Sequence, residues 1–362
     1  MNLEQFSPYK VIQLYDEIAA YRNHEVDLFQ RYPVHVKIDL TESCNQACSF
    51  CFYGDDNRDI GIKRDNITKG NHFVPLAVLQ PTLLDLAAGG TKAITLIGGG
   101  EPLLYPHIKK ILQTLSDTPM QFGVVSNGGR PMDEELLDLL SKAAWLRLSL
   151  DTLDPDKYLK LHRPKNPAVD NLPHTLQNLK AMLERRKNGM AIGASFLLNP
   201  ANYTEIVSFA RELRDIGLDY VEYKPMYLDR LGEQQKEFFL GILPELEMVK
   251  KLATSQFKVI VLMDRMSDST FVTRDFTRCW VNGITTHIGV DGQVYPCCVL
   301  AYANGMEYGN LHEQNFRDIW LGERRLKINE RLTPERCPRC WSDKTNELIE
   351  HILYETKHPN FI

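Results

Sequence analysis

The chain has 362 residues, a length that suits one large α/β domain or a barrel with an appendage. Apolar residues make up 43% and charged residues 25%, which allows a sizeable core and excludes a disordered or fibrous chain. With a net charge of −5, no apolar run of membrane-spanning length and no signal peptide, we expect a cytoplasmic protein that binds neither membrane nor nucleic acid.

Strand-like and helix-like runs alternate along the first two thirds of the chain, after one amphipathic helix over 9–23. The expected strands are 34–40, 93–97, 122–126, 145–150, 191–198 and 220–225, and the helices between them are 75–90, 107–115, 132–143, 175–187 and 203–217. Strands that alternate with helices form right-handed crossovers and a parallel sheet. The pattern predicts an α/β fold, a partial (βα)6 TIM-like barrel on which the N-terminal helix packs.

Eight cysteines fall into two sets, with none between positions 52 and 278. In a large chain without an export signal, metal or cluster ligation is a better interpretation than disulfides. Cys44, Cys48 and Cys51 lie in the loop after the first strand. Three thiolates leave a four-iron cubane with one open iron, where a substrate can bind. A zinc site is the alternative, although zinc usually takes four ligands.

The Cys44-x3-Cys48-x-Phe50-Cys51 spacing resembles the signature of the radical S-adenosylmethionine (SAM) superfamily. Further motifs of that family follow in the same order, over about residues 33–226. They are Gly99-Gly100-Glu101-Pro102 after the second strand, Ser126-Asn127-Gly128 after the third, Arg147-Leu148-Ser149-Leu150-Asp151 on the fourth, and Arg163.

The resemblance implies a role for each of these motifs. Cys44, Cys48 and Cys51 would hold a 4Fe–4S cluster, and the Glu101 carboxylate would face the methionine ammonium of SAM. Segment 147–151 would contact the ribose or methionyl part, and Arg163 the SAM carboxylate. Reductive cleavage of SAM then gives a 5′-deoxyadenosyl radical that abstracts hydrogen, while the protein orients the reactants and excludes water.

The second cysteine set surrounds a predicted hairpin at Asp291-Gly292 and a predicted helix over 315–331. This arrangement resembles the SPASM or shorter twitch domain, which holds auxiliary 4Fe–4S clusters. Five cysteines favour a single auxiliary cluster with the ligands Cys279, Cys297, Cys337 and Cys340. Cys298 remains open as a ligand in place of Cys297, as a buried thiol, or as a hydrogen-atom donor to the substrate radical. A zinc ribbon is the alternative to the cluster.

These patterns divide the chain into an N-terminal helix (1–32), the barrel (33–250), a cluster domain (255–345) and a C-terminal helix or tail (346–362). The predicted function is a radical SAM oxidoreductase or isomerase that dehydrogenates or epimerises a small, carbohydrate-like metabolite. The short segment before the first strand favours a small substrate over a leader-bearing peptide. A flavodoxin or ferredoxin would donate electrons. The alternatives are a peptide maturase and a non-catalytic iron–sulfur or zinc protein.

Several residues carry weaker signals. Tyr223, Lys224 and Tyr227 lie at the end of the sixth strand and are expected to face the substrate space, with packing or a salt bridge favoured over a catalytic role for each. Asn199 and Asn202 suit either a contact with SAM or a turn and helix cap. His287 is assigned a structural role. The polar run 55–72 is expected to cover the cluster or serve as a lid, with a plain solvated loop as the alternative.

Overall fold

The structure is a computed structural model that describes residues 7–24, 27–51, 53, 72–187, 189–225, 233–262, 274–337, 340 and 342–354. The loop expected to cover the cluster lies outside the described residues except at His72, and so does Tyr227. None of the helices in the described ranges combines the length and apolarity that a bilayer span requires.

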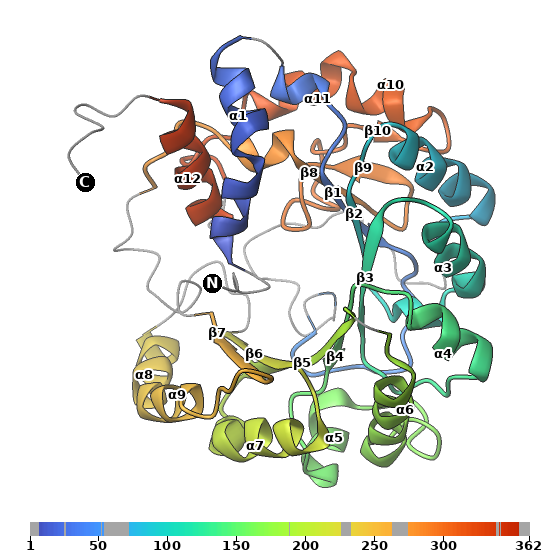
Figure 1. Ribbon diagram of the computed structural model, residues 1–362, viewed down its shortest axis with the longest axis vertical. Helices are drawn as coiled ribbons and strands as arrows, with labels where there is room; N and C mark the ends of the chain where they lie inside the picture. Colours follow the sequence, from blue (N-terminus) through green and yellow to red (C-terminus); the bar gives the residue numbers. More distant parts are fainter. Residues whose placement is uncertain are drawn as a thin grey trace.

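The described residues form one curved ten-stranded sheet, in the order β10-β9-β8-β1-β2-β3-β4-β5-β6-β7 (Figure 1). Its strands are β1 (His35–Asp39), β2 (Ala93–Ile97), β3 (Gln121–Ser126), β4 (Trp145–Ser149), β5 (Ala191–Leu198), β6 (Tyr220–Pro225), β7 (Lys258–Val261), β8 (Thr285–Ile288), β9 (Gln293–Tyr295) and β10 (Gly309–Asn310). β1 to β7 are parallel neighbours, which confirms the partial barrel and its six expected strands. β7 was not predicted, because four residues are too few for a clear strand signal.

Helices cover the outer side of this curved sheet, as Figure 1 shows. They are α2 (Leu76–Ala88), α3 (Ile108–Ser116), α4 (Glu134–Leu140), α5 (Pro155–His162), α6 (Leu172–Arg185), α7 (Ile206–Ile216), α8 (Glu233–Gly241) and α9 (Leu243–Lys250). Alternation along each strand sends one set of side chains into this helix-covered core. On β1 these are Val36 and Ile38, both fully buried. His35, Lys37 and Asp39 therefore face the inside of the barrel.

Two glycines on the inner wall of the barrel leave room for large aromatic rings, and polar side chains lie beside them. A Cβ atom on Gly123 would lie 2.0 Å from the Trp145 ring, and one on Gly193 would lie 2.4 Å from the Tyr220 ring. The large rings of β4 and β6 thus occupy space that neighbouring strands leave empty. Beside them, Arg147 of β4 and Glu222 of β6 form a buried ion pair.

The cluster domain continues the barrel sheet. β8 pairs with β1 in parallel, with Lys37 opposite His287, and β8 and β9 form the predicted hairpin. The predicted single helix over 315–331 is wrong. The chain forms α10 (Phe316–Trp320) and α11 (Glu323–Asn329) instead, because Gly322 adopts an extended conformation between them.

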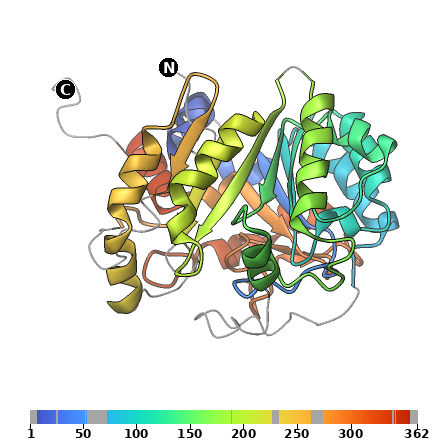
Figure 2. The same ribbon diagram turned by 90° about the horizontal axis from the view of Figure 1, so that it is seen from below.

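The N-terminal segment is also interrupted. It forms a 3-10 helix, η1 (Pro8–Leu14), and then α1 (Tyr15–Arg22). Both views show α1 beside the C-terminal helix α12 (Asp343–Leu353) (Figures 1 and 2). Val11 and Ile18 pack with Trp280 and Ile349 in a second core. Lys10 interacts electrostatically with Lys258 and His35, which places η1 near β7 and β1, at the open side of the barrel.

Candidate active site

The first cysteine set lies at the carboxyl end of β1, where parallel α/β folds place their sites. Its loop is fixed from both sides by backbone hydrogen bonds. On one side, the Gly100 nitrogen donates to the Thr41 carbonyl over 2.9 Å, and the Glu101 nitrogen donates to the Ser43 carbonyl over 2.8 Å. A Cβ atom on Gly100 would lie 2.2 Å from the Ser43 carbonyl oxygen. Only glycine permits this approach of the 99–102 loop to the cysteine loop.

Glu101 joins this loop to the motif after β3. Its side chain is 2% exposed and accepts hydrogen bonds from the Ser126 hydroxyl at 2.8 Å and the Asn127 nitrogen at 2.7 Å. Burial raises the pKa of Glu101, while these hydrogen bonds and one from Leu103 oppose the rise. Asn127 in turn contacts the Cys44 sulfur at 3.8 Å. Three predicted motifs therefore meet around one carboxylate.

The other side of the cysteine loop rests on α5, an element that the sequence pattern did not predict. The Ser49 nitrogen donates to the Leu161 carbonyl over 2.9 Å, and the Ala47 nitrogen lies 3.1 Å from the carbonyls of His162 and Arg163. Arg163 ends α5 in the left-handed region, with φ of 46°. The sequence did contain a signal for α5. Asp154 and Pro155 are an N-cap and a first-turn proline.

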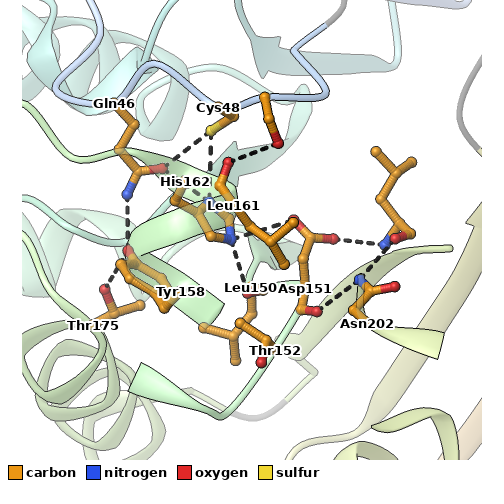
Figure 3. Close-up of polar contacts among 12 residues, drawn as sticks. Gln46, Cys48, Leu150, Asp151, Thr152, Tyr158, Leu161, His162, Thr175 and Asn202 are labelled. Atoms are coloured by element: carbon orange, nitrogen blue, oxygen red, sulfur yellow. Dashed lines mark hydrogen bonds and ion pairs between the residues drawn. The ribbon is translucent and has the colours of Figure 1, made fainter. Parts of the chain in front are cut away.

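A buried network under Cys48 was missed in the sequence (Figure 3). The His162 Nδ1 atom lies 3.6 Å from the Cys48 sulfur and 3.1 Å from the Gln46 side-chain oxygen. His162 Nε2 donates to the Leu150 carbonyl over 3.0 Å, and the ring stacks on Tyr158. The Phe50 ring, from the cysteine motif, packs against the His162 ring in a T-shaped arrangement, with the ring centroids 5.5 Å apart.

Burial disfavours the charged forms of the histidine and the thiols in this network. Burial lowers the pKa of His162, against the opposing charge of Asp151. Burial, followed by the charges of Cys51 and Cys44, raises the pKa of the Cys48 thiol. Burial and the Glu101 charge raise the pKa of Cys44 to about 12. Three thiols that interact in this way suit a multi-iron cluster, whose positive charge stabilises thiolates.

The remaining predicted SAM contacts lie at or near this edge of the sheet. Asp151 is buried with φ of 58°, accepts from the Leu197 nitrogen at 2.6 Å and lies 3.5 Å from His162. Ser149 is the half-buried last residue of β4, and Pro102 begins a buried 3-10 turn. Asn202 donates to the Asp151 carbonyl at 2.9 Å and is fully buried, which supports its reading as a turn residue.

The orientation expected for Tyr223 on β6 is wrong, whereas the packing role favoured for it is confirmed. Tyr223 faces the helix-covered core, not the substrate space, and its hydroxyl donates to the Ile206 carbonyl. Lys224, one residue later, points the opposite way because side chains alternate along a strand.

The second cysteine set brings Cys279, Cys297, Cys337 and Cys340 together. After burial, the charges of Cys340 and Cys337 raise the pKa of Cys279 to about 12. Burial raises the pKa of Cys297, followed by the charge of the adjacent Cys298 and, with smaller effects, by those of Cys279 and Cys337. Ser342 and Asn346 direct N–H groups at Cys340 and Cys279. The described residues contain no group of three His, Cys, Asp or Glu arranged to hold a single metal ion.

Cys298 approaches the barrel wall. Its sulfur lies 3.6 Å from the Lys37 Nζ atom on the inner face of β1. The adjacent cysteines thus have different surroundings, with Cys297 near the other thiols and Cys298 near β1.

Two family models match the chain. The Radical SAM superfamily model matches residues 38–213, and the SPASM model, an iron-sulfur cluster-binding domain, matches residues 279–341. These domains imply a SAM-binding 4Fe–4S cluster, SAM and auxiliary iron–sulfur ligation.

Three relatives of known description align with different shares of this chain. GTP 3′,8-cyclase of Helicobacter pylori strain 26695 is 26% identical over 345 residues, 91% of this chain and 99% of the cyclase. An S-adenosylmethionine-dependent nucleotide dehydratase of Lacinutrix mariniflava is 30% identical over 128 residues, 35% of this chain. Molybdenum cofactor biosynthesis protein moc-5 of Caenorhabditis elegans is 26% identical over 206 residues, 55% of this chain. The chain spans 25% of the dehydratase and 31% of moc-5.

Solved structures share the fold. Streptococcus suis SuiB bound to S-adenosylmethionine superposes with a TM-score of 0.62 at 15% identity, over 89% of this chain and 73% of SuiB. The AdoMet-bound anSMEcpe structure gives 0.60 at 13% identity, over 87% and 85% of the two chains. At these identities the likeness establishes the fold alone.

Proposed function

Because the chain belongs to the radical SAM superfamily and carries a SPASM iron–sulfur domain, we propose that it dehydrogenates or epimerises a small, polar, carbohydrate-like metabolite. The observation that carries the radical chemistry is the meeting of the cysteine, 99–102 and 126–128 loops around Glu101. Polar groups on the inner wall, such as Lys37 and the Arg147–Glu222 ion pair, support the substrate class, since a lipid gains little from contact with charged groups. The nucleotide substrates named for two relatives are also small and polar.

The chain's residues divide the work of binding. Cys44, Cys48 and Cys51 would hold the SAM cluster, and Glu101 and Asn127 would orient SAM beside it. When bound, this cluster would supply one electron to SAM. Cleavage of SAM would then give methionine and the 5′-deoxyadenosyl radical, which abstracts hydrogen. Ser149, Asp151 and Arg163 lie near the same edge and would hold the remainder of SAM. Cys279, Cys297, Cys337 and Cys340 would hold one auxiliary cluster.

The position of Cys298 supports epimerisation as one of the two outcomes. A thiol on the barrel wall can return a hydrogen atom to a substrate radical, whereas dehydrogenation needs an electron acceptor instead. Lys37, 3.6 Å away, would hold the Cys298 thiol in place. The Cys298→Ala variant should retain its iron and SAM cleavage but lose any epimerised product.

The test of the proposed function uses anaerobically reconstituted enzyme with dithionite and SAM. We expect about eight irons per chain, from two four-iron cubanes, together with formation of 5′-deoxyadenosine. Cys48→Ala should abolish 5′-deoxyadenosine and lose about four irons, whereas the matched Cys298→Ala variant should lose neither. SAM cleavage that survives in Cys48→Ala would refute the assignment of the first cluster.

A further inference from the structure

A buried carboxylate lies between the two cysteine sets. Asp39 is the last residue of β1, and alternation places it on the inner face of the barrel with Lys37. It is fully buried. Although it precedes Cys44 by only five residues, neither cysteine set includes it as a ligand.

Three side chains from three segments converge on one oxygen of Asp39. The Tyr302 hydroxyl donates to Oδ2 at 2.8 Å, and the Tyr53 hydroxyl at 3.3 Å. The His287 Nε2 atom lies 3.1 Å from the same oxygen. Tyr53 follows the first cysteine set, Tyr302 follows the second, and His287 belongs to β8.

The other oxygen of Asp39 lacks a hydrogen-bond partner among the described residues. The same holds for both ring nitrogens of the fully buried His287, whose Nε2 atom lies close to Oδ2 without the geometry of a hydrogen bond. Tyr302 has φ of 65°, an unfavourable region for a bulky residue. Strained backbone conformations reduce stability and cluster at functional sites, and a buried polar atom without a partner needs an explanation.

The position of this carboxylate suits a substrate between the two cofactors. The Tyr53 ring lies 3.5 Å from the position that a Cβ atom on Gly99 would take. Because the Tyr53 hydroxyl also donates to Asp39, this single side chain links Asp39 to the predicted SAM loop. On the other side, Lys37 reaches Cys298 from the same face of β1. A molecule bound at Asp39 would therefore lie near both cysteine sets.

We propose that Asp39 binds a hydroxyl group of the substrate through Oδ1, with His287 and Tyr302 as positioning residues. An ionised carboxylate oxygen only accepts hydrogen bonds, and a hydroxyl both donates to it and accepts from an ammonium such as that of Lys37. The site therefore takes a polyhydroxylated, carbohydrate-like compound with neighbouring hydroxyl groups. This assignment rests on the proposed function and specifies its substrate contact.

The experiment compares holoenzyme of the wild type with Asp39→Asn, which keeps the size of the side chain. The control is Asp291→Asn, since Asp291 also accepts from a tyrosine hydroxyl, that of Tyr295 at 2.6 Å, but belongs to the hairpin turn. Iron content, melting temperature and 5′-deoxyadenosine formed without substrate are measured first. Myo-inositol, UDP-glucose and GTP are then added as probes, and the increase in 5′-deoxyadenosine is measured.

We expect unchanged iron content in both variants, and unchanged SAM cleavage without substrate in the control Asp291→Asn. At least one probe should stimulate the wild type and Asp291→Asn, and Asp39→Asn should need about tenfold more of that probe or lose the stimulation. Tyr302→Phe should show a smaller loss, because Oδ1 is retained.

Three results would overturn the site. The first is equal stimulation of Asp39→Asn and the wild type, and the second is no stimulation of the wild type by any probe. The third is a loss of iron or a lower melting temperature in Asp39→Asn, which would make Asp39 a structural residue. The absence of 5′-deoxyadenosine from wild-type enzyme would instead refute the proposed function, so the two failures can be told apart.

Discussion

Glu101 and His162 show what single residues of this site contribute beyond their motifs. The sequence places Glu101 in a family motif, and the resemblance assigns it to SAM. The structure adds that it also ties Ser126 and Asn127 to the cysteine loop. His162 has no sequence signal of its own, since one histidine before an arginine is an ordinary helix end. Its contact with Cys48 depends on α5 returning to the loop, which local pattern cannot reveal.

Glu101 provides a direct test of SAM binding. Glu101→Gln removes the negative charge that would face the methionine ammonium. Its amide has one acceptor oxygen, so it keeps either the hydrogen bonds from Ser126 and Leu103 or the one from Asn127, but not all three. We expect weaker SAM binding by about tenfold or more, with iron content unchanged, because a charged hydrogen bond is stronger than a neutral one. SAM titration followed by EPR of the reduced cluster measures this. Unchanged SAM affinity would show that Glu101 only organises the loops.

His35 makes stability depend on pH. Burial, with smaller effects from Lys37 and Lys10, lowers its pKa to about 3, and its Nε2 atom contacts the Thr95 hydroxyl at 2.8 Å. Below pH 6.5 the unfolded chain gains a proton here and the folded chain does not, so stability falls as the pH drops. The loss between pH 7 and pH 5 should be about 2 kcal/mol for this group.

The measurement is the melting temperature of anaerobic holoenzyme at both pH values. His35→Gln should show a smaller decrease than the wild type, because glutamine does not titrate. The exposed His174→Gln is the control and should decrease as the wild type does. An equal decrease in His35→Gln would show that His35 is protonated in the folded protein.

Among the helices and strands, the sequence predicted those that have a clear pattern of apolar residues and missed those that do not. The six central strands were predicted because each places apolar residues of the helix-covered core at alternate positions, as Val36 and Ile38 do on β1. α5 was missed because polar residues dominate its eight positions. One continuous helix was predicted over 315–331 because Gly322 is the only residue that signals the break between α10 and α11. The contacts of α11 with the N-terminal segment join residues almost 300 positions apart, which no local pattern encodes.

Arg325 of α11 is the residue that makes those contacts. It is fully buried, donates to the carbonyls of Phe29 at 2.5 Å and Trp320 at 2.9 Å, and lies 3.4 Å from the centre of the Trp320 ring. Arg325→Met leaves these carbonyls without their donor, and we expect a loss of about 3 kcal/mol, or roughly 5 °C in melting temperature. Arg325→Lys should recover little, since an ammonium cannot reproduce the planar stack.

The neighbouring Arg324→Met is the control, because the Arg324 side chain is 62% exposed, and it should change stability by less than about 0.5 kcal/mol. Thermal unfolding of the holoenzymes compares the three variants. Similar stabilities for Arg325→Met and Arg324→Met would mean that the buried guanidinium contributes no net stabilisation.

For the whole molecule, the sequence suggests two separate parts, whereas the structure joins both in one sheet. The composition and cysteine sets suggest a barrel and a separate cluster domain. In the structure, β8 of the second part pairs with β1 of the first, and the pairing brings His287 beside Lys37 and Asp39. The candidate substrate contact therefore exists only where the two parts meet. Sequence could not place it, because strand pairing between distant segments leaves no periodic signal.

This shared sheet predicts one cooperative unit rather than two. If β1 and β8 open together, the backbone amides of Ile38 and Ile288 should exchange with solvent through the same global unfolding event. Hydrogen exchange of the holoenzyme, followed by mass spectrometry, should give peptides covering β1 and β8 equal protection and equal sensitivity to low denaturant. Peptides over the two-residue edge strand β10 serve as the internal comparison and should exchange faster, because an edge strand has few ladder bonds. Exchange of β8 well before β1 would mean that the cluster domain opens alone, and the Asp39–His287 contact would then be broken by a local motion that leaves the barrel folded.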